Sequence, residues 1–172
     1  MGTLIAIYVR ARPAIEREIK TRFPSAFTEP GSFFFATELN INDGNYPIDR
    51  LEQHSKQLQT EVLWLVFQSA VDTFEYAHWI AGGCLRKLVY GRTAERTWQI
   101  VEGRAEAWEA NCFFDERTRS DLVSLADTVN EREKVNRIFR DRLIEPGQTL
   151  PFVNARETAR AVAEYFVLPG WD

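Results

Sequence analysis

Four side chains near the middle of the chain have the types that acid–base catalysis requires: His78, Arg86, Glu102 and Glu109. An imidazole or a carboxylate can move a proton, and a guanidinium can bind an anionic group of a substrate. Tryptophan lies close in sequence to both glutamates, and an apolar wall can raise the pKa of one carboxylate above that of the other. One hypothesis is therefore a small enzyme that acts on a polar or anionic small molecule through these four residues.

The segment that holds two of these candidates, FEYAHWIAGGCLRKLVYG at 74–91, fits two kinds of secondary structure. Its apolar residues suit a helical stripe, but Gly82 and Gly83 inside a helix would cost about 2 kcal/mol relative to two alanines. The same glycines suit a tight turn, because glycine adopts positive φ freely. We therefore predict a β-hairpin with strands at about 73–81 and 84–90.

With this glycine pair as the turn, Trp79 faces Arg86 and His78 faces Lys87 across the hairpin. A guanidinium over an indole contributes about 0.5–1 kcal/mol at an exposed site, which favours this register. The ammonium beside His78 would favour the neutral imidazole. His78 and Arg86 then lie on opposite faces of the sheet, which argues against a site that uses all four candidates. A structural role for both is the simpler interpretation.

The order of the remaining elements predicts the fold class. Apolar or β-branched runs predict strands, and apolar spacing of three and four residues predicts helices. In chain order the expected elements are strand 3–10, helix 14–23, strand 32–39, helix 47–59, strand 61–70, the hairpin, strand 97–103, helices within 120–134 and 134–144, and helix 154–166. We expect turns at 40–45 and 91–96. The order predicts an α+β fold: a mixed sheet, β-α-β-α-β followed by a three-strand meander, with helices packed on one face and C-terminal helices.

Two regions leave alternatives open. The segment AEAWEANCFF, 105–114, fits no single pattern. The run 120–144 fits one long helix as well as two short ones, with Ser120 as a possible N-cap. Asn154 and Glu157 occupy the positions of a capping box before the last helix.

Composition and charge narrow the class of protein. A length of 172 residues suits a single domain, 1–172, and 45% hydrophobic residues are typical of a globular chain. The net charge of −4 provides no basic field for nucleic acid or an anionic membrane. No apolar run is long enough for a spanning helix or a signal peptide core, so we expect a soluble cytoplasmic protein.

Metal and cofactor motifs do not occur in the sequence. Cys84 and Cys112 lack CxxC spacing, and two histidines are too few for a local zinc-ligand set. The chain contains no P-loop, GxGxxG, HExxH or GxSxG motif. We therefore expect neither a metal nor a cofactor.

The run from Asp115 to Arg142 carries seven acidic and seven basic residues. Such balanced alternation is typical of solvated helix faces with ion pairs between successive turns. A second interpretation makes Arg132, Arg137 and Arg140 an anion-binding or partner-docking rim.

Between residues 61 and 109, the sequences EVLWLVFQSAVDTFEYAHWIAGGCLRKLVYG and RTWQIVEGRAEAWE resemble a group of uncharacterised bacterial proteins, represented in cyanobacteria among others, with the signature R.L.YG…TW..VEG..E.WE. The likeness covers about fifty residues and involves the aromatic residues together with Arg86, Gly91, Gly103 and Glu109. The resemblance implies no activity, cofactor or catalytic residue for this chain.

The high aromatic content and the lack of a catalytic motif favour a non-catalytic module that binds another protein or self-associates. Its predicted binding residues are Trp79, Arg86, Trp98 and Trp108. We expect a protein partner or a homo-oligomer, and no nucleic acid, membrane or metal. The enzyme hypothesis requires instead that its four polar side chains converge in one cleft.

Overall fold

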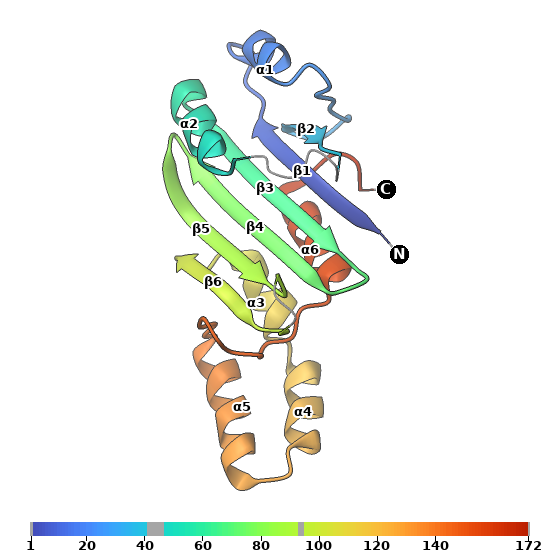
Figure 1. The fold of residues 1–172 in the computed structure, drawn as a ribbon, viewed down its shortest axis with the longest axis vertical. Coiled ribbons are helices and arrows are strands. Elements are labelled where there is room, and N and C mark those ends of the chain that lie inside the picture. Colours follow the sequence, from blue (N-terminus) through green and yellow to red (C-terminus); the bar gives the residue numbers. More distant parts are fainter. Residues whose placement is uncertain (1, 41–46, 93–94, 172) are drawn as a thin grey trace.

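The computed structural model describes residues 2–40, 47–92 and 95–171, which contain one six-stranded sheet and six helices (Figure 1). The strands are β1 Thr3–Arg10, β2 Phe34–Glu38, β3 Glu61–Gln68, β4 Thr73–Ile80, β5 Gly83–Tyr90 and β6 Trp98–Gly103. The helices are α1 Glu16–Arg22, α2 Asp49–Leu58, α3 Ala107–Phe113, α4 Glu116–Leu125, α5 Val129–Asp141 and α6 Ala155–Phe166. The predicted α+β fold with C-terminal helices is confirmed. The expected turns at 40–45 and 91–96 include residues outside the described ranges.

The strands pair only in antiparallel fashion within the described residues, so the expected mixed sheet is wrong. Their order is β2-β1-β3-β4-β5-β6, which places β1 between β2 and β3. Strand β2 enters beside β1 in the opposite direction, with Ala6 opposite Glu38 and Arg10 opposite Phe34.

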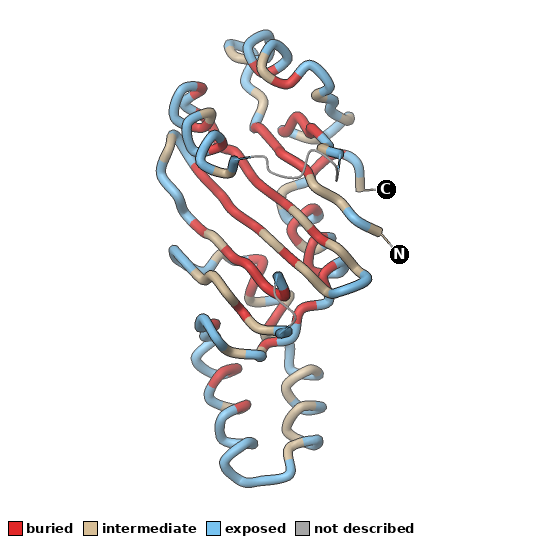
Figure 2. The backbone as a smooth tube through the Cα atoms, in the orientation of Figure 1, coloured by how far each residue is buried: buried red, intermediate tan, exposed pale blue. Residues whose placement is uncertain are grey.

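Helices cover both faces of the sheet, which corrects the expectation that they pack on one face. Helices α3 and α6 pack on one face, here called the α6 face, and α1 and α2 pack on the other, the α2 face (Figure 1). In β3, Leu63 and Leu65 belong to the core of the α6 face, whereas Val62 and Trp64 belong to that of the α2 face. This strand is apolar along most of its length because both of its sides are covered; Figure 2 shows the buried central strands.

The β4–β5 hairpin is confirmed, but its turn lies one residue earlier than expected. Ile80 pairs with Gly83, so the two turn residues are Ala81 and Gly82. Both have positive φ, 49° and 87°, as a two-residue turn of this kind requires. A Cβ on Gly82 would lie 2.7 Å from the Cβ of Lys56 in α2, so glycine is also needed here for close packing.

A register shift between His78 and Trp79 changes the cross-strand partners in this hairpin. Trp79 faces Cys84, and His78 faces Arg86. The expected pairs, Trp79 with Arg86 and His78 with Lys87, are therefore wrong. The shift leaves Leu85 as an extra residue in β5, so beyond it, on the side away from the turn, His78 lies opposite Arg86 and the two side chains share one face of the sheet.

Helices α4 and α5 form a hairpin that projects from the end of the sheet (Figure 1). The side chain of Asp115 accepts a hydrogen bond from the Thr118 N–H and starts α4, so Ser120 is not the N-cap. Thr128 caps α5 by accepting from the N–H of Glu131. The run that fitted one helix or two therefore contains two, because a capping box between Thr128 and Glu131 starts a new helix after the loop.

Helix α3 lies in the segment 105–114 that the pattern left unassigned. It starts with a reciprocal capping box between Glu106 and Glu109. Asn154 caps α6, as the sequence predicted, by accepting from a backbone N–H. Across the described residues, no helix combines the length and the apolar character needed to cross a membrane.

Candidate functional site

A cluster of charged side chains is buried on the α6 face of the sheet. Three of its members lie on adjacent strands, Glu61 at the start of β3, His78 near the end of β4 and Arg86 in β5. Glu106 and Glu109 join them from the start of α3. His78 is 5% exposed, Arg86 4% and Glu109 1%. We call these five residues the ionic cluster.

His78 lies between two carboxylates. Its Nδ1 is 2.5 Å from Oε1 of Glu106, and its Nε2 is 2.9 Å from Oε1 of Glu61. The Nε2–H direction is not aligned with a hydrogen-bond acceptor, so the second contact is an ion pair rather than a well-formed hydrogen bond. Glu61 also accepts a hydrogen bond of 2.7 Å from Arg10, and the ring of Phe166 packs edge-on against the imidazole.

The two carboxylates keep His78 protonated at neutral pH. Burial by itself lowers the pKa of His78, but the interactions with Glu106 and Glu61 outweigh burial and raise this pKa to about 9. The same pairing holds the pKa values of Glu106 and Glu61 below their ordinary value despite burial. The expectation that Lys87 favours the neutral imidazole is therefore wrong. A general base must be unprotonated at the working pH, so this histidine is suited to an ion pair instead.

The carboxylate of Glu106 is fully engaged. Its Oε2 accepts hydrogen bonds from the hydroxyl of Tyr76, at 2.6 Å, and from the indole N–H of Trp108, at 2.8 Å. Burial, followed by the negative charge of Glu106, raises the pKa of Tyr76 well above its ordinary value, so the phenol stays a neutral donor. This network connects β4 to the start of α3.

Arg86 and Glu109 form a bidentate ion pair in the interior. Arg86 Nε donates to one carboxylate oxygen at 2.8 Å, and Nη2 donates to the other at 2.6 Å. The remaining nitrogen, Nη1, donates to the backbone carbonyls of Glu102 and Gly103. Burial raises the pKa of Glu109 above its ordinary value, although Arg86 opposes this shift. Such a pair orders the surrounding structure and directs the guanidinium at Glu109 and at two backbone carbonyls.

The structure brings together three of the four catalytic candidates. His78, Arg86 and Glu109 lie in the ionic cluster. Glu102 instead lies opposite Lys87 in the β5–β6 register, on the α2 face, and its side chain is exposed. Glu102 reaches Arg86 only through its backbone carbonyl. The convergence of four side chains in one cleft, which the enzyme hypothesis requires, is therefore absent among these residues.

The predicted binding tryptophans are core residues in this structure. Trp98 and Trp108 belong to the core of the α6 face, and Trp79 belongs to that of the α2 face. Their exposed fractions are 0, 3 and 3%, respectively. The indole N–H of Trp98 donates to the backbone carbonyl of Pro151. Their aromatic mass therefore contributes to packing, and a contact surface must be sought among other residues.

The predicted site residues do not include four participants in this network: Arg10, Glu61, Tyr76 and Glu106. The available signal was the single carboxylate at the start of the apolar strand Glu61–Gln68, because a charge in a central strand needs a partner. No pattern in the sequence identified the partners of Glu61, because His78 and Arg10 belong to strands that are far from Glu61 along the chain.

The residues of the bacterial resemblance have packing roles in the structure. A Cβ on Gly103 would lie 2.0 Å from the carbonyl oxygen of Leu85, and one on Gly91 would lie 2.7 Å from that of Asp72. Arg86 is held by its interior ion pair with Glu109. Packing and ion pairing in the sheet therefore account for Arg86, Gly91 and Gly103 without a catalytic function.

The α4–α5 hairpin exposes apolar side chains at its tip. Leu125, at the end of α4, is 76% exposed, and Val129, at the start of α5, is 67% exposed. Three residues of α5 are buried within the hairpin, whereas α4 has no buried residue (Figure 2). The buried residues of α5 are Val135, Ile138 and Phe139.

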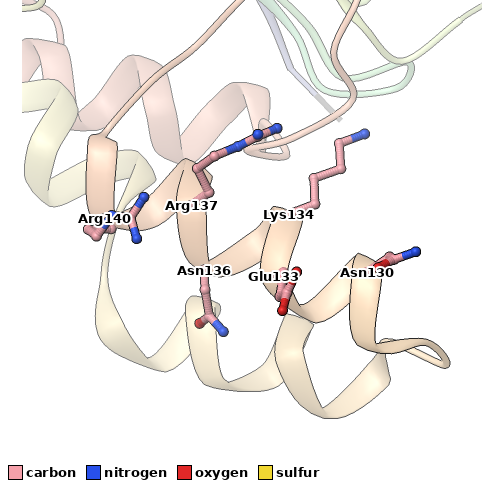
Figure 3. A pocket seen from close by; sticks show the side chains of 6 residues that line it. All are labelled: Asn130, Glu133, Lys134, Asn136, Arg137 and Arg140. Atoms are coloured by element: carbon pink, nitrogen blue, oxygen red, sulfur yellow. The ribbon is translucent and has the colours of Figure 1, made fainter.

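Two adjoining hollows lie along this hairpin. One, of about 480 Å³, lies between the helices and is lined by Phe114, Glu116, Arg119, Asn136, Phe139, Arg140 and Arg142. The other, of about 470 Å³, lies over α5 and is lined by Asn130, Glu133, Lys134, Asn136, Arg137 and Arg140 (Figure 3). No residue of the ionic cluster lines either hollow. We call the two together the hairpin groove.

Neither a metal-binding cluster among the described residues nor a similar known protein indicates the function. In residues 2–40, 47–92 and 95–171, no group of three or more His, Cys, Asp or Glu side chains could hold a metal ion. Comparisons of the chain with protein-family models, curated proteins and solved structures found no match.

Proposed function

We propose that the protein is a non-catalytic binding module whose α4–α5 hairpin docks a partner protein. The observation that carries this proposal is the apolar tip of a projecting hairpin, where Leu125 and Val129 are mostly exposed. Exposed aliphatic residues gathered on one projecting element are typical of contact surfaces. Full burial of each side chain against a partner would contribute about 1.5–3 kcal/mol.

The weak packing of the hairpin supports the same function. Its apolar cluster consists of three buried residues of α5, with Leu122 and Val123 of α4 and Phe114 and Leu150 only partly buried against it. Most of the stability of a helix in a protein comes from packing of its apolar face. A partner that covers α4 would therefore add packing that the chain does not supply by itself.

The ionic cluster favours binding over catalysis. Its histidine carries a proton, and its arginine and carboxylates are directed at one another rather than toward an open site.

For the location we propose the cytoplasm, because Cys84 and Cys112 are both free thiols and a reducing compartment preserves that state.

Site-specific photo-cross-linking in the cells that naturally contain the protein tests this function. A photoreactive phenylalanine analogue replaces Leu125 in one variant and Leu85, an exposed residue of β5, in the matched control. We expect a discrete adduct from position 125 and none from position 85, because only the hairpin contacts the partner. Replacing Val129 by serine in the Leu125 variant should weaken the adduct.

Three results would overturn the proposal. These are the absence of an adduct at position 125, equal adducts at both positions, or an adduct whose mass corresponds to two copies of the 19.9 kDa chain. The last result would identify a second copy, not another protein, as the occupant.

A further inference from the structure

We propose that the hairpin groove binds an acidic segment of the partner protein; this inference rests on the proposed function and specifies the chemistry of its partner. The groove combines an excess of cations with the partly buried ring of Phe114, and it lies on the same projecting hairpin as the exposed tip.

The charge of the groove is opposite to that of the whole chain. Five cations and two carboxylates line the two hollows, whereas the protein has a net charge of −4. The cations are Arg119, Lys134, Arg137, Arg140 and Arg142, and the carboxylates are Glu116 and Glu133. Electrostatic complementarity therefore favours an occupant that carries several carboxylates.

Three of the cations are available to a ligand. Within the described residues, the side chains of Lys134, Arg137 and Arg142 make no hydrogen bond or close ion pair, although the charge of Arg137 helps to lower the pKa of Asp141. Figure 3 shows Lys134 and Arg137 extending from the same side of α5. Arginine presents a planar set of donors that matches a carboxylate in a bidentate arrangement, so these groups suit aspartate and glutamate side chains.

The other two cations are already positioned by neighbours. Arg119 donates to Glu116 and to Asn136, which connects α4 to α5 across the groove. Arg140 pairs with Asp141 on the surface. Exposed pairs of this kind are weak and can exchange one carboxylate for another at little cost.

The charge of the whole chain favours a peptide over a nucleic acid, and an aromatic ring in the groove suits an apolar side chain of that peptide. Phe114 and Phe139 line the hollow between the helices and contact each other edge to face, with ring centroids 5.7 Å apart. Phe139 is buried, but the partly buried ring of Phe114 can pack against an apolar side chain that lies between acidic residues. A nucleic-acid backbone would extend past the groove onto a chain whose net charge is −4, which provides no extended basic field for it, whereas a short acidic segment needs only the groove itself.

Titration of the isotope-labelled full chain followed by NMR tests the inference. The probe is a capped heptapeptide, Asp-Glu-Asp-Phe-Glu-Asp-Glu, and the control peptide has Asn and Gln at the acidic positions. With the acidic probe near 1 mM we expect backbone amide shifts at Arg119, Asn136 and Arg140, since millimolar affinity corresponds to about 4 kcal/mol. The neutral peptide should produce no such shifts at the same salt concentration.

A pair of variants with equal charge change locates the binding. Arg140→Gln with Arg142→Gln should weaken binding of the acidic heptapeptide about tenfold, because two guanidiniums are lost from the groove. Arg156→Gln with Arg160→Gln removes two exposed arginines from α6 and should change the affinity less than about twofold. Circular dichroism verifies that both variants are folded.

The outcomes separate this inference from the proposed function. Absence of amide shifts in the groove, equal effects of the two double variants, or a single-stranded oligonucleotide of the same charge binding as tightly would each overturn the acidic-segment inference. If an adduct still forms at position 125 in that case, the proposed function stands and only the chemistry of the partner is wrong. Loss of both signals would overturn both proposals.

Discussion

Removing the charge of Glu109 should destabilise the protein strongly. Glu109 is 1% exposed and accepts two hydrogen bonds from Arg86, which is 4% exposed. Glu109→Gln keeps the shape of the side chain and can still serve the capping box of α3, so it isolates the loss of the charge. Breaking a buried ion pair by removing one partner costs about 3–5 kcal/mol, because the other charge remains buried.

Because glutamine retains part of the hydrogen bonding to Arg86, we expect the low end of this range, about 3 kcal/mol. For a chain of this size that corresponds to a decrease in Tm of about 6–12 °C. Urea unfolding at pH 7, monitored by tryptophan fluorescence and circular dichroism, measures the free energy of unfolding directly.

Glu157→Gln provides the matched control for this substitution. Glu157 occupies the same third position in α6 and pairs with Arg160, but its side chain is 58% exposed. We expect a loss below about 0.5 kcal/mol for the control, because exposed pairs contribute little. Combining Arg86→Met with Glu109→Leu should cost less than the sum of the two single changes. A loss below about 1 kcal/mol for Glu109→Gln would refute the assignment of a buried, mutually dependent pair.

Three further measurements test the interior network, the sheet and the hairpin. The pKa of His78 in the folded protein, about 9, exceeds its ordinary value of 6.5, so its contribution to stability is complete below pH 6.5 and is lost as the pH rises through 9. Urea unfolding should therefore show that the free energy of unfolding declines by about 2–3 kcal/mol between pH 6.5 and 9. A decline of the same size in the His78→Gln variant would contradict this. Gly103→Ala should cost more than about 2 kcal/mol because its Cβ would crowd a backbone carbonyl at φ +80°, whereas Gly31→Ala, at φ +90° in open space, should cost about 1 kcal/mol; equal losses would show that crowding contributes nothing. Asp115→Ala should reduce hydrogen-exchange protection in α4 by about 1 kcal/mol through loss of the N-cap, and unchanged protection would exclude that role.

The elements that the sequence predicted correctly depend on local interactions. The strand at Thr3–Arg10, the β4–β5 hairpin and the cap of α6 at Asn154 follow from apolar runs, turn residues and capping chemistry. Each of these signals involves residues within a few positions of one another. Helix α3 was missed although Glu106 and Glu109 have capping-box spacing, because its short apolar pattern also fits other structures.

Errors in pairing arose from a one-residue difference. The expected turn at Gly82 and Gly83 moved to Ala81 and Gly82, and a register shift near His78 followed. The earlier turn by itself would leave His78 and Arg86 on opposite faces, and the one-residue register shift brings them to the same face because side chains alternate. The sequence favours glycine at a turn but does not fix which glycine occupies which turn position.

From its sequence alone, this protein is an α+β chain with a tight hairpin in its middle, apolar central strands and a charge-rich helical region near residues 115–142. Only the tertiary structure decided that the tryptophans at 79, 98 and 108 are buried and that Glu61 and Glu106 enclose His78. The physical reason is the sequence separation of the interacting residues. Secondary structure follows from neighbours along the chain, whereas burial and charge pairing depend on strand order and register, which bring together residues far apart in sequence.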